Sequence, residues 1–161
     1  MNDNVKSPDD TLVSAENDRP AILIAFGDLQ SSHGLVQASR VKRMLFDQKI
    51  WFVPKNNKSM IAGAKILFYQ RSMGAIATAD LIGVGRPSKE DAGALYQLGL
   101  SHFEVKLDIA NVDEFLEPVS FRPLVEQLGF LTNKKYWGTS LRFASRSIPT
   151  PDLEIILKAR T

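Results

Sequence analysis

The stretch 64-AKILFYQRSMGAIATADLIGVG-85 decides how the middle of the chain folds. Residues 64–71 form an apolar run that favours a strand, and residues 74–84 alternate weakly between apolar and polar positions. Between them stands Ser72-Met73-Gly74, a segment short enough for a tight turn. The sequence therefore predicts a β-hairpin at the centre of the chain.

Further strands flank this hairpin on both sides. An apolar run of about six residues precedes Gly27-Asp28, a second apolar run ends at Pro54, and residues 102–112 alternate cleanly as a half-buried strand does. The order of elements lacks the regular strand–helix alternation of a doubly wound parallel sheet. It predicts an α+β fold with a compact, mostly antiparallel sheet or small barrel and helices packed outside.

The predicted helices are few and short. Apolar positions at helical spacing predict a basic amphipathic helix within residues 31–49, capped near Ser31 or Ser32. Residues 118–130 read as a short helix bounded by prolines, and residues 86–99 as a loop with one helical turn. A terminal helix opens with Thr150 as its N-cap and Pro151 at its first position.

Length and composition indicate one globular domain. At 161 residues the chain is long enough to bury a core. Residues 1–19 are acidic and without periodicity, so they are expected to form a disordered tail before a single domain at 20–161. No apolar run is long enough to span a membrane, and the N-terminus lacks an apolar signal core, which predicts a cytoplasmic protein.

The charge is distributed unevenly although the net charge is only +2. Residues 40–71 carry eight bases and one acid, and residues 130–149 carry four bases and no acid. If the fold brings these two basic stretches together, they form the cationic face that is typical of phosphate binding. The alternative is a set of solvated lysines scattered over several faces.

Nothing in the sequence points to catalysis, a metal or a cofactor. Cysteine is absent, which excludes disulfides, thiolate metal sites and a cysteine nucleophile. Neither His33 nor His102 has a second histidine or clustered carboxylates at metal-ligand spacing. We expect His102 to be structural and His33 to face solvent. Ser72 and Ser140 are candidate nucleophiles, but the sequence shows no base near either.

Aromatic residues lie in or beside both basic stretches. Trp51 and Phe52 are neighbours on a predicted strand, so their side chains point to opposite faces, and one of them must leave the core or sit in a pocket. Stacking on a base contributes roughly 1–3 kcal/mol. Packing in the core of a small barrel is the alternative for each aromatic residue.

Two segments resemble a known family. Residues 118–157 resemble the C-terminal half of EVE-domain proteins of the PUA-like superfamily, which is related to the YTH and ASCH domains, and residues 50–81 resemble the middle of the same domain. The resemblance covers about residues 20–158. The C-terminal matches are Phe130, Asn133, Lys134, Trp137, Gly138, Arg142, Arg146, Ile148 and Asp152, and the earlier ones are Trp51, Val53, Pro54, Lys65, Phe68, Tyr69 and Gly74.

The resemblance implies a small, strongly curved mixed β-barrel that binds DNA or RNA without catalysis and holds a chemically modified base in an aromatic pocket. Trp51 would stack on the base, with Tyr69 or Trp137 as further candidates, although Trp137 is favoured as scaffold. Main-chain groups near Gly27-Asp28 and in the Gln70-Arg71-Ser72 turn would read its polar edge. The predicted phosphate ligands are Lys55, Lys58, Lys134, Lys135, Arg142 and Arg146.

Two other functions stay open. One is a hydrolase or esterase-like enzyme of the PUA-like group, which would use Lys65 or Ser72. The other is a protein-interaction module in which the basic helix, residues 33–48, docks on an acidic partner.

Overall fold

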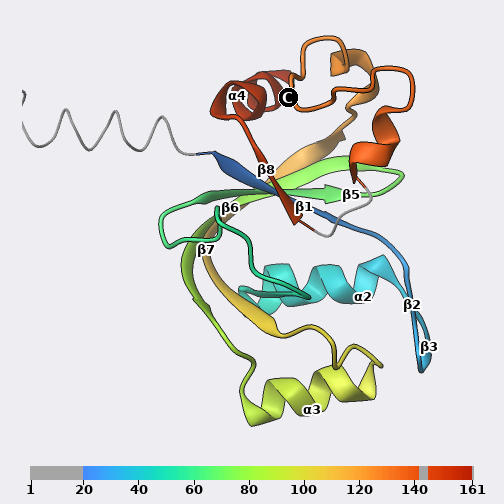
Figure 1. Cartoon of the computed structure of the whole chain (residues 1–161), viewed down its shortest axis with the longest axis vertical. Coiled ribbons are helices and arrows are strands. Elements are labelled where there is room, and N and C mark those ends of the chain that lie inside the picture. Colours follow the sequence, from blue (N-terminus) through green and yellow to red (C-terminus); the bar gives the residue numbers. More distant parts are fainter. Residues whose placement is uncertain (1–19, 142–144, 161) are drawn as a thin grey trace, which may run out of the picture.

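The computed structural model describes residues 20–141 and 145–160. Its central element is a six-stranded mixed β-sheet. The predicted tail and Arg142 lie outside the described residues. All neighbouring strands are antiparallel except the β1–β5 pair, which is parallel. In sheet order the strands are β4 (Ile50–Val53), β7 (Val105–Val119), β6 (Gly74–Gly85), β5 (Lys65–Gln70), β1 (Ala21–Phe26) and β8 (Ser145–Ile148) (Figure 1).

The predicted central hairpin is confirmed as β5 and β6. Its turn needs a glycine at position 74, because φ there is +124° and a Cβ atom would lie 2.5 Å from the Val119 carbonyl oxygen. Register shifts interrupt the pairing of β6 with β7 at three places. Such irregularities increase twist and bend a sheet, and here they curl it into a small barrel.

Both faces of the sheet are covered. Ile22, Ile24 and Phe26 of β1 point into one core cluster, whereas Leu23 and Ala25 point into another. Figure 1 shows α4 (Thr150–Ala159) on one side of the strands, and α2 (Ala38–Arg43) and α3 (Lys89–Gln97) on the other. A strand buried on both sides reads as a continuous apolar run, which explains why β1 was predictable.

The edge strands β4 and β8 do not pair with each other, and a loop fills the gap. The loop, residues 54–60, follows β4 and bonds to β8 through side chains. Asn57 Nδ2 donates to Ser145 Oγ over 3.3 Å, and the hydroxyls of Ser59 and Ser147 are also hydrogen-bonded. We call this contact the seam. The result is the predicted α+β architecture of a small, curved mixed barrel with helices packed outside.

The predicted start of the basic helix is wrong. Residues 29–36 form a separate hairpin of β2 (Leu29–Ser31) and β3 (Gly34–Val36), and the helix begins only at Ala38. Gly34 has φ +111°, a conformation that no α-helix accommodates. The first helical N–H, on Ala38, donates to Asp28 Oδ1 over 2.8 Å, so Asp28 supplies the cap. The π-helical turn η1 (Met44–Gln48) continues α2.

Three other local predictions need correction. The loop predicted at 86–99 contains α3, which is capped reciprocally by Ser88 and Asp91. The short helix predicted after residue 118 is reduced to the 3₁₀ turn η2 (Arg122–Leu124), because β7 pairs with β6 as far as Val119. The terminal helix has Pro149 rather than Thr150 at its N-cap position. Two elements, β8 and the 3₁₀ turn η3 (Trp137–Leu141), lack a sequence pattern that predicts them.

Candidate functional site

An aromatic-walled cavity of about 240 Å³ lies where β1 ends and the sheet curls toward α3. We call it the aromatic cavity. β1 and β4 supply one wall, and α3 with the loop behind it supplies the other. Its lining residues are Ile24, Ala25, Phe26, Gly27, Val41, Trp51, Phe52, Val53, Pro54, Arg71, Leu95, Leu98, Leu100, His102 and Phe103.

Trp51 is fixed in the wall of this cavity. Only 4 % of its surface is exposed, and its ring packs edge-on against Phe26 and Phe68 at centroid distances of 5.1 Å each. Phe52 is also buried, on the other side of β4, against Leu95 and Leu100. Helix α3, which the sequence did not predict, therefore covers Phe52. Both residues are buried and both line the cavity, but Trp51 belongs to the main core cluster and Phe52 to the small cluster under α3.

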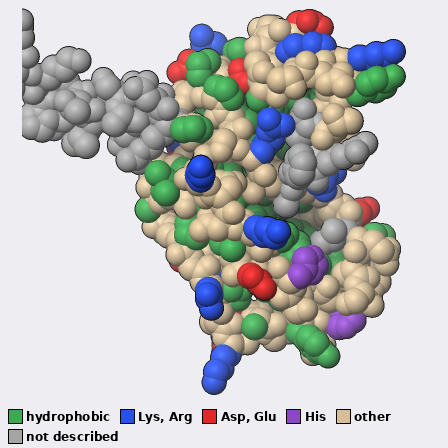
Figure 2. Space-filling view, in the orientation of Figure 1, with side chains coloured by type: hydrophobic (Ala, Val, Ile, Leu, Met, Phe, Trp, Pro, Cys, Tyr) green, Lys and Arg blue, Asp and Glu red, His purple; other side chains and the backbone are tan. Residues whose placement is uncertain are grey.

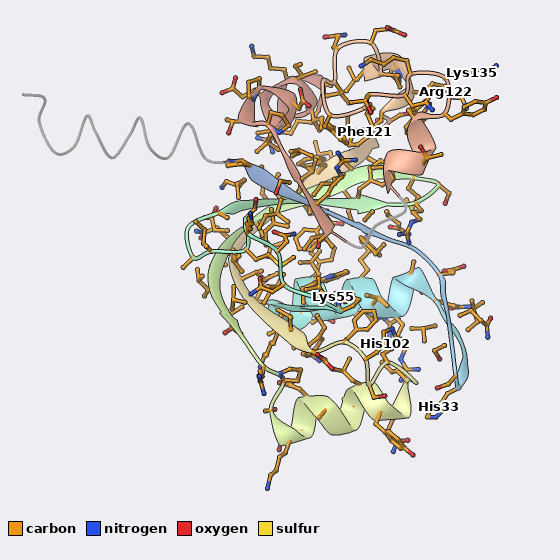
Figure 3. All side chains as sticks on the ribbon, viewed as in Figure 1. His33, Lys55, His102, Phe121, Arg122 and Lys135 are labelled. Carbon is orange, nitrogen blue, oxygen red and sulfur yellow. The ribbon has the colours of Figure 1, made fainter. Side chains whose placement is uncertain are left out.

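Polar groups gather at the mouth of the aromatic cavity. His102 is exposed and lines it, and Lys55 is exposed next to the lining residue Pro54. Figure 3 shows Lys55 at the level of α2 and His102 below it, between α2 and α3. In the same orientation, Figure 2 shows a histidine bordering hydrophobic surface near a cationic side chain. The mouth thus combines apolar walls with groups able to donate hydrogen bonds.

Arg71 is held at the rim by three contacts. Its N–H donates to the Phe26 carbonyl over 2.7 Å, and its Nε donates to the Leu141 carbonyl over 3.3 Å. Its side chain packs over Gly27, where an added Cβ would lie 3.3 Å from Arg71 Cβ. The glycine that follows β1 therefore makes room for the arginine that follows β5.

A second hollow, of about 250 Å³, shares Arg71 with the aromatic cavity. We call it the Trp137 hollow; its lining residues are Tyr69, Arg71, Ser72, Trp137, Gly138 and Leu141. Tyr69 is buried and packs on Phe121 at 4.6 Å, and this burial raises the pKa of its phenol. Trp137 is half-buried against the core cluster that contains Phe121. Trp137 thus packs against the core, as a scaffold residue does, and the exposed part of its ring lines the hollow.

The residues predicted for a single base pocket are divided between these two cavities. Gly27 and Trp51 line the aromatic cavity, whereas Tyr69, Ser72 and Trp137 line the Trp137 hollow. Arg71 lines both. Asp28 and Gln70 line neither: Asp28 caps α2, and Gln70 Oε1 is buried without a hydrogen-bond partner among the described residues.

The two basic stretches meet at the seam. Lys55 and Lys58 are exposed on the loop that bonds to β8, and Arg146 lies on β8 itself, with its guanidinium 5.1 Å from the Phe130 ring centre. Ser145 and Ser147 point toward the loop, so Arg146 between them points to the opposite face of β8, toward Phe130. The two basic stretches therefore meet through their main chains, but Arg146 does not join the exposed lysines in one cationic face. Two other basic residues of the first stretch have acidic partners: Lys42 lies 3.7 Å from Glu114, and Lys65 pairs with Asp80.

The other predicted phosphate ligands have local partners. The Lys134 ammonium donates to the carbonyls of Val125 and Leu128, each over 2.8 Å. Lys135 is exposed and lies 5.2 Å from the Tyr136 ring centre. A side chain bonded to two main-chain carbonyls supports the loop between η2 and η3, whereas Lys135 projects to the surface at the α4 end of the molecule (Figure 3).

Two acidic side chains outside both cavities, on β6 and α3, also have partners. Hydrogen bonds from Lys65 and Asn111 lower the pKa of Asp80. Burial alone would raise the pKa of Asp91, but hydrogen bonds from the Ser88 main chain and Lys106 outweigh it and lower that pKa. No cluster of three or more histidine, cysteine or acidic residues able to hold a metal occurs within the described parts of the chain.

Sequence reasoning missed one wall of the aromatic cavity. Leu95, Leu98 and His102 come from α3 and the loop behind it. The Ser88–Asp91 capping box was the available signal for this helix. His33 was expected to face solvent only; it is exposed, but its Nδ1 lies 2.9 Å from the Gln97 carbonyl and joins the β2–β3 hairpin to the end of α3.

The fold is similar to those of two solved structures. An ASCH protein of Zymomonas mobilis has a TM-score of 0.56 with 9 % identity, covering 89 % of this chain and 98 % of its own. A protein of Pseudomonas putida has a TM-score of 0.51 with 16 % identity, covering 88 % and 99 %. At these identities the similarity shows the fold alone.

Two curated proteins are similar in sequence. A UPF0310 protein of Pyrococcus abyssi is 24 % identical over 127 residues, which are 71 % of this chain and 88 % of the relative. Another, of Pyrococcus horikoshii, is 26 % identical over 128 residues, 68 % and 84 % of the two chains. No family model matches. No helix among the described residues has the length and apolar character to cross a membrane.

Proposed function

We propose that this protein is a non-catalytic nucleic-acid-binding domain that takes one base into the aromatic cavity. The observation that carries this proposal is an aromatic-walled cavity whose mouth adjoins Arg71, His102 and Lys55. We further propose that the chain is an EVE-type member of the PUA-like group and that the base carries a chemical modification. These finer assignments rest on the resemblance of residues 118–157 and 50–81.

The size of the aromatic cavity suits a single ring system. Its volume of about 240 Å³ lies below the roughly 300–1,000 Å³ of cavities for drug-sized ligands. The aromatic wall offers stacking and edge contacts, and one stacked base contributes roughly 1–3 kcal/mol. A base fits these walls better than an extended chain or a lipid, because it is flat and carries polar edges.

Selectivity would come from the polar rim and from shape. A buried donor or acceptor that the ligand leaves unpaired costs about 1–3 kcal/mol, so Arg71 and His102 can distinguish bases by their edges. A methyl group buried in the same cavity contributes only about 0.8 kcal/mol. A tenfold preference for a methylated base corresponds to about 1.4 kcal/mol, so the shape of the cavity and the displacement of water must contribute as well.

Phosphate contacts would come from the seam. Lys55 and Lys58 are exposed there, whereas Arg146 on the adjoining strand points to the opposite face and packs on Phe130. Each neutralised phosphate releases counterions, so affinity should fall as salt rises, with a slope that counts the contacts. Substituting Lys58 should weaken binding to all sequences and lower that slope without changing base preference.

We infer binding rather than catalysis because the candidate catalytic residues lie outside the aromatic cavity. Lys65 bonds to Asp80, and both line a different surface hollow. Ser72 lines the Trp137 hollow, whose lining contains no histidine or carboxylate. The protein-interaction alternative would use the basic helix, but its Val41 forms part of the cavity wall and its Lys42 lies near Glu114.

The test is a titration of labelled single-stranded and duplex oligonucleotides at low and moderate salt, followed by fluorescence anisotropy. The probes carry unmodified bases, 5-methylcytosine, 5-hydroxymethylcytosine or N6-methyladenine. One modified single-stranded probe is expected to bind at least tenfold more tightly than its unmodified counterpart. Leu98→Phe, which adds volume to the cavity wall without removing core atoms, should abolish this preference, as should His102→Ala.

His33→Ala is the matched control, because His33 is the other histidine and does not line the aromatic cavity. It should leave the base preference unchanged. Equal, weak and salt-sensitive binding of every probe, unaffected by Leu98→Phe, would reject the proposal and leave only a basic surface.

A further inference from the structure

We infer that the nucleic acid occupies two subsites, with consecutive bases in the aromatic cavity and the Trp137 hollow and the phosphate between them on Arg71. The inference rests on the proposed function and makes it more specific. It assigns a single-stranded dinucleotide step as the ligand, in place of a single base.

The two subsites lie on opposite faces of the parallel β1–β5 pair. Successive side chains of a strand point to opposite faces. Phe68 accordingly packs against Trp51 in the wall of the aromatic cavity, while the next residue, Tyr69, packs on Phe121 and lines the Trp137 hollow. Both cavities reach the end of the strands, because each is lined by Arg71, which directly follows β5.

Arg71 stands between the subsites as a positioned cation. Its main chain is bonded to Phe26 at the end of β1, its side chain packs over Gly27, and its Nε donates to the Leu141 carbonyl in the wall of the Trp137 hollow. An arginine guanidinium is planar and suits phosphate oxygens. In a nucleotide chain the phosphate lies between two nucleosides, and the order cavity, Arg71, hollow reproduces that arrangement.

The two subsites have similar volumes, although the Trp137 hollow is more open and has fewer lining residues. Their volumes are about 240 and 250 Å³, so each can take one ring system. Trp137 is half-buried and so keeps part of its ring accessible, and Tyr69 provides a second aromatic wall. Because every base has an apolar face, a wall of this kind accepts the second base with little sequence preference.

This geometry selects single-stranded nucleic acid. Bases that occupy opposite faces of a strand pair must be unstacked from each other and turned apart. Stacked, paired bases in a duplex cannot do so without the cost of unstacking and unpairing, a few kcal/mol, whereas a single strand has little to lose. The structure thus predicts a preference for single strands that comes from the separation of the subsites and is independent of the base modification.

The experiment compares mononucleotides with dinucleotides on the intact protein. The ligands carry one of the three modified bases named above or its unmodified counterpart. For each base, calorimetry measures the dissociation constants of the 5′-monophosphate and of the dinucleotides with thymidine on the 3′ side or on the 5′ side. Both dinucleotides are also measured with a neutral methylphosphonate linkage. One dinucleotide is expected to bind about tenfold more tightly than the monophosphate, the contribution of one stacked base. Trp137→Ala should remove this gain and leave the monophosphate unaffected.

The linkage phosphate and Arg71 should act as a pair. The methylphosphonate is expected to bind wild type about tenfold more weakly than the natural linkage, but to bind Arg71→Lys and Arg71→Ala with a smaller difference or none. The modified ligand probes the contact without altering the protein, so a folding defect in a variant cannot imitate it. Tyr136→Ala and Lys158→Ala are the matched controls, because neither residue lines the subsites.

The outcomes separate the two proposals. Equal affinities for the monophosphate and both dinucleotides, or a methylphosphonate penalty that persists in the Arg71 variants, would overturn the two-subsite inference while leaving the single-base proposal intact. Failure of every nucleotide to bind would reject the proposed function itself, and the inference with it.

Discussion

The two walls of the aromatic cavity are built very differently. β1 and β4 belong to a core cluster that contains seventeen buried residues among those described, including Trp51 and Phe68. α3 is attached through a cluster of only three, Phe52, Leu95 and Leu100. Apolar burial supplies most of the stability of a fold, so the first wall is a rigid platform and the second is thinly anchored. We therefore expect α3 to be the more easily displaced wall of the cavity.

Polar contacts supply the rest of the attachment of α3. Asp91 bonds to Ser88 in the cap and lies 3.0 Å from Lys106 on β7, and His33 reaches the Gln97 carbonyl. Gly99, with φ +74°, lets the end of the helix approach the β2–β3 hairpin, since a Cβ there would lie 2.7 Å from Ser31 Oγ. Exposed contacts of this kind contribute about 0–1 kcal/mol each, so they orient the helix more than they secure it.

The largest expected effect is at the centre of the platform. Phe68→Ala removes a fully buried ring that packs on Trp51, and should lower the free energy of unfolding by about 3–5 kcal/mol. Chemical denaturation followed by circular dichroism measures it. Phe68→Leu retains most of the side-chain volume and should lower the free energy of unfolding clearly less than Phe68→Ala does. A Phe68→Ala protein as stable as wild type would show that the platform is not the rigid side.

A smaller and more local effect is expected from Leu95→Ala in α3. Leu95 is buried, but its cluster is small, so the loss is limited by the free energy of detaching the helix. Hydrogen exchange of the α3 amides should speed up about tenfold or more, while the global free energy of unfolding changes by less than about 1 kcal/mol. Gln97→Ala on the same helix is the control. A global loss equal to that of Phe68→Ala would break the comparison.

The smallest effect is expected from Asp91 and is dependent on pH. Folding lowers the pKa of Asp91. The ionised carboxylate therefore stabilises the folded state at pH values above the ordinary aspartate pKa of about 4, and this stabilisation is lost as the pH falls through the folded-state pKa. At neutral pH, Asp91→Asn should lower the free energy of detaching or unfolding α3 by about 0.5–1 kcal/mol. Protection of the α3 amides, corrected for intrinsic exchange, should fall more below pH 4 in wild type than in the variant; equal acid sensitivity would contradict this role.

The parts of the fold that sequence predicted are those with strong local patterns. The apolar run of β1 and the hairpin around Gly74 are legible because burial on both faces and a positive φ each leave a residue signature. α3 was missed because Leu95 is its only buried residue among those described, so the helix carries almost no apolar periodicity. The start of α2 was misplaced because its cap, Asp28, stands ten residues before Ala38 in sequence.

The sequence predicted several residues of the candidate site, but it did not predict that they are divided between two cavities. Trp51, Gly27 and Arg71 were expected and lie together, since they follow or occupy strands that the sequence reveals. The separation of Tyr69 and Trp137 into a second hollow depends on which face each strand residue takes, and therefore on the register of the whole sheet. His102 reaches the cavity only because α3 folds back over β4, which no local pattern records.

The pairing of β1 also determines the order in which the molecule can assemble. Ile22 pairs with Ile66 on one side and with Ser147 on the other, 44 and 125 residues further along the chain. A ribosome must therefore synthesise nearly all of the described chain before the most buried strand gains its second neighbour. Contacts so distant in sequence make folding slow, and until β8 arrives β1 exposes an apolar edge to other chains. Truncation before Ser145 should accordingly yield aggregation during expression, even though both walls of the aromatic cavity precede that point.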